Sequence, residues 1–337
     1  MAKKRVRTMK QTKNDKGIQI RRRIKAFLGR WIGVRRTWWR FVINANCDYY
    51  ESQMRFLFML ISNYHVIEKC IAMPNFDPGH GKERVEVVVG DLFKYRELGF
   101  DLNHPQYIAA MQAVQEYDQV HKRAGYDLPA GLQADIDRLL EGTTILEHQQ
   151  PHVTRQEFFS HINGGFDKFA RSRHSVRAYS GKDIPDETIR AIVDLARTTP
   201  TACNRQPNKT YVVCNPNMIK QIAALQGGGR GFSENANKLF VVTSAVEAFG
   251  NNEYHEVFKA GGMYVMNLLY ALHFYQIGAC PLIWSGDKER DNQLRKLINI
   301  SDNEEIIMII SAGYPVENFS YVTSVRNPLE ESLVIIK

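Results

Sequence analysis

The stretch Arg173-His174-Ser175-Val176-Arg177-Ala178-Tyr179 decides most of what this sequence predicts, together with a second stretch, Thr199-Pro200-Thr201-Ala202-Cys203-Asn204-Arg205-Gln206-Pro207. The first has two arginines and a serine at alternating positions, so in an extended segment these side chains point the same way. The second offers small polar donors in a turn bounded by prolines, directly before the apolar residues 211–213. Together they suit a phosphorylated ligand with a flat polar ring, because a phosphate dianion is held by fixed cations and by hydroxyl or backbone donors.

Length and composition indicate an ordinary soluble protein. The chain has 337 residues, enough for two domains or for one domain with a large extension, and is 44% hydrophobic and 24% charged. Its five cysteines are scattered, with no CxxC pair and no histidine at ligand spacing. We therefore expect reduced thiols in a cytoplasmic protein, and neither a disulfide framework nor a metal site. No segment reaches the ~18 apolar residues of a membrane-spanning helix, and the N-terminus lacks the apolar region of a secretory signal.

The positive charge is concentrated at the N-terminus. Residues 1–40 contain 15 Lys/Arg and one acid, a local charge of +14, while the rest of the chain has a net charge of −6. We expect residues 1–45 to be a basic, partly disordered arm with an amphipathic helix. Its apolar stripe, with arginines mostly on the other side, is Ile24, Phe27, Leu28, Trp31, Val34, Trp38 and Phe41.

The role of this stripe is left open by the sequence. Residues 20–43 suit an anionic membrane surface or a protein partner, because indoles settle at the headgroup level and cations meet acidic lipids. The stripe could instead dock on the body of the protein. A nucleic-acid partner is the least favoured interpretation.

Residues 46–150 are predicted to form a helical extension. Apolar residues between 54 and 67 predict one long buried helix, and the patterns at 105–123 and 129–146 predict two more. A turn-rich loop, residues 73–81, lies between the first helix and the second.

One polar group in this extension is a weak candidate for function. His65, Glu68 and Lys69 fall on neighbouring helical turns. His65 could serve as a ligand or a base, but such groups are more often structural clusters with all partners satisfied.

Residues 151–337 have an α/β pattern. We expect a helix around 157–171, another opened by Pro185, and a buried central helix over 257–275 that ends before Gly278. The apolar runs that predict strands are Tyr211–Val213, Leu239–Thr243 and Ile306–Ile310. The glycine-rich residues 227–231 lack the GxxxxGK[ST] spacing of a phosphate loop, so we predict a mobile active-site loop there.

Three later stretches complete a pattern: Gly278–Ser285, Ala312–Pro315 and Arg326–Glu331. In order and spacing, the stretches over roughly residues 160–337 resemble the nitroreductase-like FMN-dependent oxidoreductases. The resemblance implies an α+β fold, a sandwich of a mixed sheet with helices and a long central helix. It also implies an interlocked homodimer with FMN at the interface. The helical extension resembles that of members linked to surface-polysaccharide synthesis.

The resemblance assigns roles to the first stretch and to the C-terminal one. Arg173 and Ser175 would hold the FMN phosphate, with Arg326 joining them. His174 stands where the family often has a second arginine. Arg177 would lie near the pyrimidine end of the flavin and act in catalysis by stabilising the reduced ring.

The remaining cofactor-binding residues come from two other stretches. One stretch of the family reaches the flavin across a subunit interface. The residues of this chain that match it are Pro200, Thr201, Asn204 and Gln206. Those matching the loop over the dimethylbenzene-to-N5 side are Pro281, Trp284 and Ser285. A backbone N–H of this loop would reach N5.

The implied function is that of an FMN-dependent oxidoreductase with a ping-pong mechanism. NADH or NADPH would reduce the flavin and leave, and a small acceptor (a nitroaromatic, a quinone or an unknown metabolite) would then bind in the same pocket. One alternative is a flavin-binding or degenerate subunit of a membrane-associated polysaccharide biosynthesis assembly. Another is a dehydrogenase acting on a carrier-linked or glycan intermediate. The expected location is the cytoplasm, either free or held at the inner face of the membrane.

Overall fold

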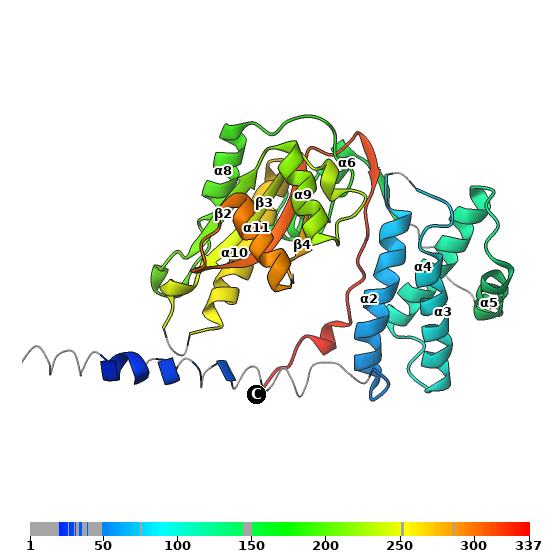
Figure 1. Ribbon diagram of the computed structural model, residues 1–337. Helices are drawn as coiled ribbons and strands as arrows, with labels where there is room; N and C mark the ends of the chain where they lie inside the picture. Colours follow the sequence, from blue (N-terminus) through cyan, green and yellow to red (C-terminus); the bar gives the residue numbers. More distant parts are fainter. Residues whose placement is uncertain are drawn as a thin grey trace, which may run out of the picture.

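Two bodies make up the part of the chain that the structure describes. This computed structural model describes residues 20–25, 27–29, 31, 34–35, 39, 49–74, 76–143, 150–250, 253–285 and 287–337. Figure 1 shows a body of helices α2 to α5 beside an α+β body that holds the sheet. The C-terminal segment crosses from the second body to the first. Most of the predicted basic arm lies outside the described residues.

The helical body has a core of its own. Its helices are α2 Gln53–Ile71, α3 Lys82–Glu97, α4 Pro105–Arg123 and α5 Ala130–Leu140. Helix α2 begins after Ser52, whose hydroxyl accepts a hydrogen bond from the Arg55 N–H at 3.3 Å. The aromatic rings of Phe56, Tyr95 and Tyr117 are fully buried among these helices.

The predicted helices of this body are confirmed in part. Helix α4 has the predicted bounds, whereas α3 was not predicted from the sequence. Helix α5 ends at Leu140, earlier than the predicted residue 146, because Gly142 adopts a φ of +67°, a left-handed conformation that ends helices.

The α+β body contains a four-stranded sheet. In spatial order its strands are β2 Asn208–Val213, β3 Lys238–Ala245, β5 Glu304–Gly313 and β4 Gly278–Ile283. All three pairings are antiparallel, so within the described residues the sheet is not of the mixed type that was expected. The connection from β2 to β3 starts and finishes at the same end of the sheet, and so does the connection from β4 to β5. The two strands of each pair therefore run in opposite directions.

Helices cover both faces of this sheet (Figure 1). Helices α8 Asp186–Ala196 and α10 Glu256–Phe274 pack on the face that carries Phe240 and Val242. Helices α9 Pro216–Gln226 and α11 Lys288–Ile298 pack on the face that carries Leu239 and Val241. The alternation along β3 therefore buries both of its faces.

The central helix α10 matches the predicted segment 257–275 closely, but in a single chain only one side of it is covered. Its residues Val257, Tyr264 and Leu268 are buried. Phe258 and Met263 are 42% and 49% exposed, so an apolar face of α10 remains open to solvent.

Two predictions at the edges of this body are wrong. The helix expected over 157–171 is two short helices, α6 Arg155–Phe158 and α7 Phe166–Ser172, because Gly164 and Gly165 interrupt it. The loop expected at Pro281, Trp284 and Ser285 is instead strand β4 as far as Ile283, because residues 278–283 pair with β5. A separate pair of strands, β1 His152–Thr154 and β6 Asn318–Ser320, holds the chain beside α6.

Among the described residues, no helix is both long and apolar enough to span a bilayer.

Candidate cofactor site

The first stretch runs extended beside β4 and the end of β5. The Val176 N–H donates to the Ala279 carbonyl at 3.1 Å, and the Ser180 N–H donates to the Tyr314 carbonyl at 2.7 Å. A Cβ on Gly278 would lie 2.8 Å from Cγ1 of Val176, so only glycine allows this approach. The backbone of residues 173–180 is therefore fixed against the sheet.

Arg177 is a buried cation with an unused donor. Its side chain is only 7% exposed, and its Nη1 makes a long contact of 3.4 Å with the Ser175 carbonyl. The guanidinium lies 5.7 Å from the centre of the Phe232 ring. Its Nε is buried with no hydrogen-bond partner in the described protein. Because an unpaired buried donor is costly, this atom marks a place for an acceptor that the chain itself does not supply.

Arg173 and Arg326 lie close enough to repel each other. Burial lowers the pKa of Arg173, and the neighbouring Arg326 cation lowers it further. An arginine remains charged at pH 7 despite such a shift. Nη1 of Arg326 donates to the Ser324 carbonyl, but within the described residues neither arginine forms an ion pair, so both charges can bind an anion.

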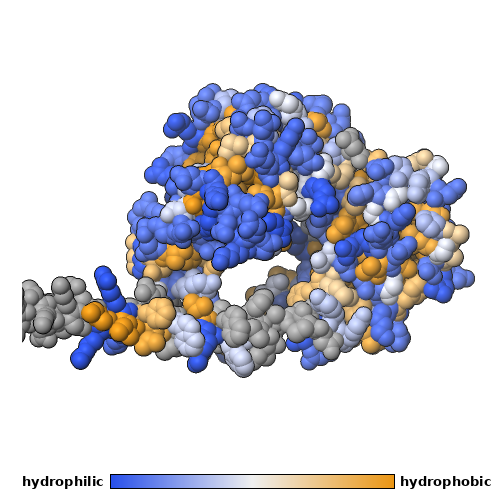
Figure 2. Space-filling model, viewed as in Figure 1, coloured by the Kyte–Doolittle hydropathy of each residue, from blue (hydrophilic) through white to orange (hydrophobic). Residues whose placement is uncertain are grey.

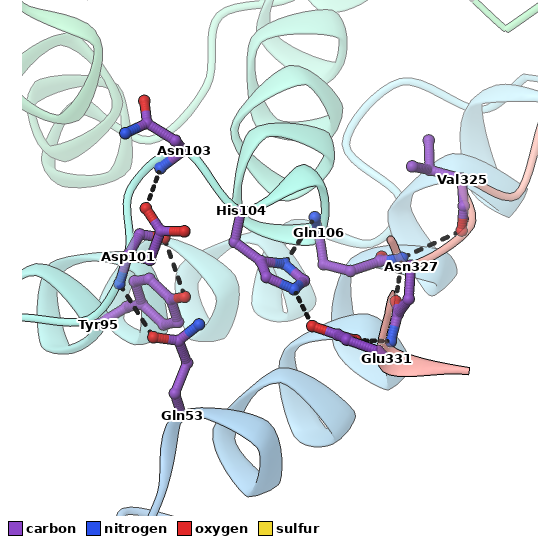
Figure 3. A network of polar contacts seen from close by, with 9 residues as sticks. All are labelled: Gln53, Tyr95, Asp101, Asn103, His104, Gln106, Val325, Asn327 and Glu331. Atoms are coloured by element: carbon purple, nitrogen blue, oxygen red, sulfur yellow. Dashed lines mark hydrogen bonds and ion pairs between the residues drawn. The ribbon is translucent and has the colours of Figure 1, made fainter. Parts of the chain in front are cut away.

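The helical body positions Arg326 through a polar network around the C-terminal segment, shown in Figure 3. The Gln106 side-chain amide donates to Oδ1 of Asn327 at 2.7 Å, and His104 Nε2 lies 2.9 Å from a Glu331 oxygen. Gln106 is 2% exposed, so the network is buried at its centre. The neighbour of Arg326 in the chain is thus held by α4.

His174 does not add a third cation to this group. Burial lowers the pKa of His174, and the Arg173 cation lowers it further, so the ring is neutral at pH 7. The ring lies 4.4 Å from the ring of Tyr321. Beneath it, burial lowers the pKa of His273 to about 4, and the Nε2 atom of His273 lies 2.9 Å from the Ser172 hydroxyl. His273 was not identified from the sequence, where it is one residue of an apolar helix.

The second stretch lies elsewhere in the same chain. It leads into β2 at one edge of the sheet, whereas Val176 binds β4 at the other edge, three strand spacings or about 14 Å away. The two also lie at opposite ends of the strands, because Asn208 is aligned with Ser244 at the far end from Ala279. The predicted residues Pro200, Thr201, Asn204 and Gln206 are therefore not brought to Arg173 within one chain.

This second stretch is nevertheless well defined. The Gln206 N–H donates to the Thr201 hydroxyl at 3.0 Å. Asn204 and Gln206 have φ values of +55° and +51°, a strained conformation for residues other than glycine. Such strain is typical of segments that are shaped for binding.

Strand β4 brings Pro281 beside the first stretch, but the side chain of Trp284 is used in packing. Its indole N–H donates to Asp291 on α11 at 2.9 Å, and the side chain packs against the core beneath α9 and α11. Ser285 is exposed beyond the end of the strand. Any contact of residues 284–285 with a cofactor would therefore involve their backbone, as the sequence suggested.

The polar group of α2 divides into a structural pair and a half-buried lysine, Lys69. His65 Nδ1 lies 3.0 Å from the buried carboxylate of Glu68, an arrangement that favours the structural interpretation. Burial lowers the pKa of Lys69, and the Arg177 cation lowers it further. No pattern in the sequence connects Lys69 with the first stretch.

Comparisons with known proteins identify the family of this chain. The model of the nitroreductase family matches residues 170–229, which include both stretches. A protein of Archaeoglobus fulgidus named as an NADH dehydrogenase/NAD(P)H nitroreductase is 30% identical over 151 residues, covering 44% of this chain and 84% of the relative. An iodotyrosine deiodinase of Nematostella vectensis is 25% identical over 211 residues, covering 54% of this chain and 79% of the relative. A nitroreductase from Desulfovibrio desulfuricans, solved in complex with FMN, covers 52% of this chain and 98% of its own, with 25% identity and a TM-score of 0.44.

The chain therefore belongs to the nitroreductase family of oxidoreductases. Family membership confirms the resemblance inferred from the stretches over residues 160–337. The helices and sheet of the structure itself confirm the α+β fold class. FMN with NADH or NADPH is the cofactor set that this family membership supports.

Proposed function

We propose that this protein is an FMN-dependent oxidoreductase that uses NADH or NADPH to reduce a small acceptor. The observation that carries this proposal is the buried Arg177, whose Nε lacks a partner, beside the unpaired cations Arg173 and Arg326. These groups fit FMN, since a phosphate dianion suits Arg173, Ser175 and Arg326, and an electron-rich ring edge suits Arg177. FMN, when bound, accepts two electrons as hydride from a nicotinamide and releases them to a second molecule.

A ping-pong order follows if donor and acceptor use one pocket in turn. The acceptor would be a nitroaromatic, a quinone or an unknown metabolite, and the names of the curated relatives support the first class. In this scheme Arg177 binds the ring edge on which negative charge develops, while the backbone beside β4 keeps the pocket in shape.

The first test is the visible spectrum of the purified protein, with identification of the released cofactor, followed by addition of NADPH. We expect a yellow protein that releases FMN and bleaches when NADPH is added without oxygen. A colourless protein that does not take up added FMN would contradict the proposal.

We further propose that the active form is a homodimer. The predicted residues of the second stretch lie far from Arg173 in one chain, and an apolar face of α10 that includes Phe258 and Met263 is exposed. A partner chain packed on this face would cover it and could bring its own Thr201 and Asn204 to the site.

We also propose that residues 20–43 bind an anionic membrane surface at the cytoplasmic face. Ile24, Phe27 and Trp31 are 54%, 63% and 56% exposed, which speaks against docking of these residues on the body. Figure 2 shows this hydrophobic cluster at the lower left, next to strongly hydrophilic residues. Apolar and basic groups on one exposed helix suit acidic headgroups.

Deletion of residues 1–40 should abolish sedimentation with vesicles that contain anionic phospholipid and leave the flavin spectrum unchanged. The physical reason is that each Lys or Arg near an anionic surface contributes about 1 kcal/mol. Neutral vesicles and high salt provide the controls, since salt screens this attraction. Full binding after the deletion would show that the arm is not the membrane contact.

A further inference from the structure

The second stretch is fixed to helix α10 at both of its ends. At its start, the Asn267 side-chain amide of α10 donates to the Thr199 hydroxyl at 3.0 Å. Directly after its last residue, the Asn208 side-chain amide donates to the Ala260 carbonyl of α10 at 3.2 Å. Thr199 is buried, so the first of these ends is shielded from water. The stretch therefore follows the same helix whose open face we propose as the dimer contact.

A third anchor holds the middle of the stretch. Arg205 and Glu253 form a bidentate ion pair, with Nη1 to Oε2 at 2.8 Å and Nη2 to Oε1 at 3.0 Å. Arg205 also donates to the Ala248 carbonyl at 3.1 Å, and the Gly250 N–H donates to the Glu253 carboxylate at 2.7 Å. Two parallel hydrogen bonds between charged groups fix orientation as well as distance, so Arg205 is held firmly.

Glu253 leads directly into α10. The N–H of Glu256, the first residue of the helix, donates to the Glu253 carbonyl at 2.9 Å. The Arg205 guanidinium also lies 5.5 Å from the centre of the Phe249 ring, in the same turn. All three anchors of the second stretch thus belong to α10 or to the turn that precedes it.

Between these anchors the backbone is strained. Cys203, Asn204 and Gln206 have φ values of +53°, +55° and +51°, and they are three of the six described non-glycine residues with a positive φ. Their side chains are exposed, so no burial within the chain offsets this strain. Such a conformation persists only where the surrounding bonds impose it, and the Arg205 pair lies inside the strained segment.

The strained turn lies beside the proposed dimer contact. Met263 and Asn267 are four residues apart, which places them on one side of α10. Met263 is exposed on the open face, whereas Asn267 holds the start of the second stretch. The Asn204 side chain is exposed as well, and it forms no hydrogen bond within the part of the chain that the structure describes. A chain packed on Met263 would therefore lie close to this turn.

We propose that Arg205, Glu253 and Asn267 are positioning residues, which hold the second stretch in the strained shape that binds the flavin of a partner chain. The inference rests on the proposed function, because it takes the stretch to be part of the cofactor site of the dimer. The three residues act through the backbone of the stretch and do not touch the cofactor themselves. One helix, α10, then serves both the dimer contact and the flavin-binding turn.

The first test measures FMN affinity in Arg205→Met, from the quenching of FMN fluorescence when the cofactor is added to the FMN-free, full-length protein. The dissociation constant should rise about tenfold, because only chains with a correctly shaped stretch are competent to bind. Asn267→Leu should act in the same direction through a different anchor. Arg205→Glu should also weaken binding, and adding Glu253→Arg to it should restore part of the affinity. Sedimentation velocity of the same samples shows whether they remain dimeric.

A second readout needs no cofactor. The amides of Asn204, Arg205 and Gln206 are hydrogen-bonded within the turn, to Thr201 and Ala202. In the FMN-free Arg205→Met protein these amides should exchange with deuterium about tenfold faster than in the wild type, because loss of an anchor makes local opening easier. Mass spectrometry of peptides from the second stretch measures this rate.

Arg155→Met is the matched control. Arg155 also pairs with a carboxylate distant in sequence, that of Glu317, at 2.9 Å. This pair joins the start of α6 to the segment before β6 and does not involve the second stretch. FMN affinity and exchange in the second stretch should therefore stay at their wild-type values.

Four results would overturn the inference. They are an unchanged FMN affinity in both Arg205→Met and Asn267→Leu, weaker binding without faster exchange, weaker binding that appears only with dissociation into monomers, and equal losses in Arg155→Met. A wild-type protein that takes up no FMN would refute the proposed function together with this inference. Wild-type binding that the variants leave unchanged would refute the inference alone.

Discussion

Replacing Arg177 by methionine is expected to lower the two-electron reduction potential of bound FMN by about 30–60 mV. A hydrogen bond to a charged group contributes about 1.5–3 kcal/mol, and 30 mV corresponds to about 1.4 kcal/mol for two electrons. The potential falls because the lost cation stabilises the reduced ring more than the oxidised one. Spectroelectrochemical titration of the holoprotein measures this shift.

The same change should not destabilise the protein without FMN. The Arg177 guanidinium is buried with an unused Nε, so methionine removes an uncompensated charge while keeping contact with Phe232. Arg177→Lys should retain most of the potential. Arg190→Met, at an exposed position on α8, is the control. An unchanged potential in Arg177→Met would remove this residue from the flavin site.

Replacing Met263 by glutamate is expected to turn the proposed homodimer into monomers that lose FMN. A carboxylate buried in an apolar interface costs several kcal/mol, and a two-fold axis places it there twice. The dimer dissociation constant should therefore rise by about 10³-fold or more. The loss of FMN follows if the second stretch of one chain completes the site of the other. Sedimentation velocity and the flavin content of the monomer fraction are the measurements.

A matched control for this variant is Ala224→Glu on α9, which covers the other face of the sheet and is also exposed. It should remain dimeric and yellow. A Met263→Glu protein that stays dimeric would place the interface elsewhere. A monomer that keeps FMN at full affinity would show that one chain is sufficient for binding.

Local patterns in the sequence predicted much of the α+β body. The long apolar segment over 257–275 is helix α10, and the apolar runs at 211–213, 239–243 and 306–310 are part of strands β2, β3 and β5. These predictions hold because buried elements need apolar residues, which are visible in the sequence. Strand β4 was not predicted, because the segment Gly278-Ala279-Cys280-Pro281 contains glycine and proline, which normally argue against a strand. Its position at the edge of the sheet tolerates the proline.

The candidate site was predictable only where its residues are adjacent in the chain. Arg173 and Arg177 share one extended segment, so their alternation alone predicted a common direction. The effect of the Arg177 charge on the pKa of Lys69 depends on how the two bodies pack, and no local pattern contains that information. The direction of Trp284 was likewise set by Asp291, a partner on a helix that the sequence did not predict.

The network in Figure 3 also bears on the order in which the parts of this protein fold. The bonds from Gln106 to Asn327 and from His104 to Glu331 join residues 221 and 227 positions apart. Contacts so distant in sequence form late, because closure of a long loop must come first. During synthesis the helical body emerges early, yet Arg326 takes its place only after residues 327–331 have also been made and have bound α4. The phosphate site that we propose is therefore completed later than the helical body that helps to position it.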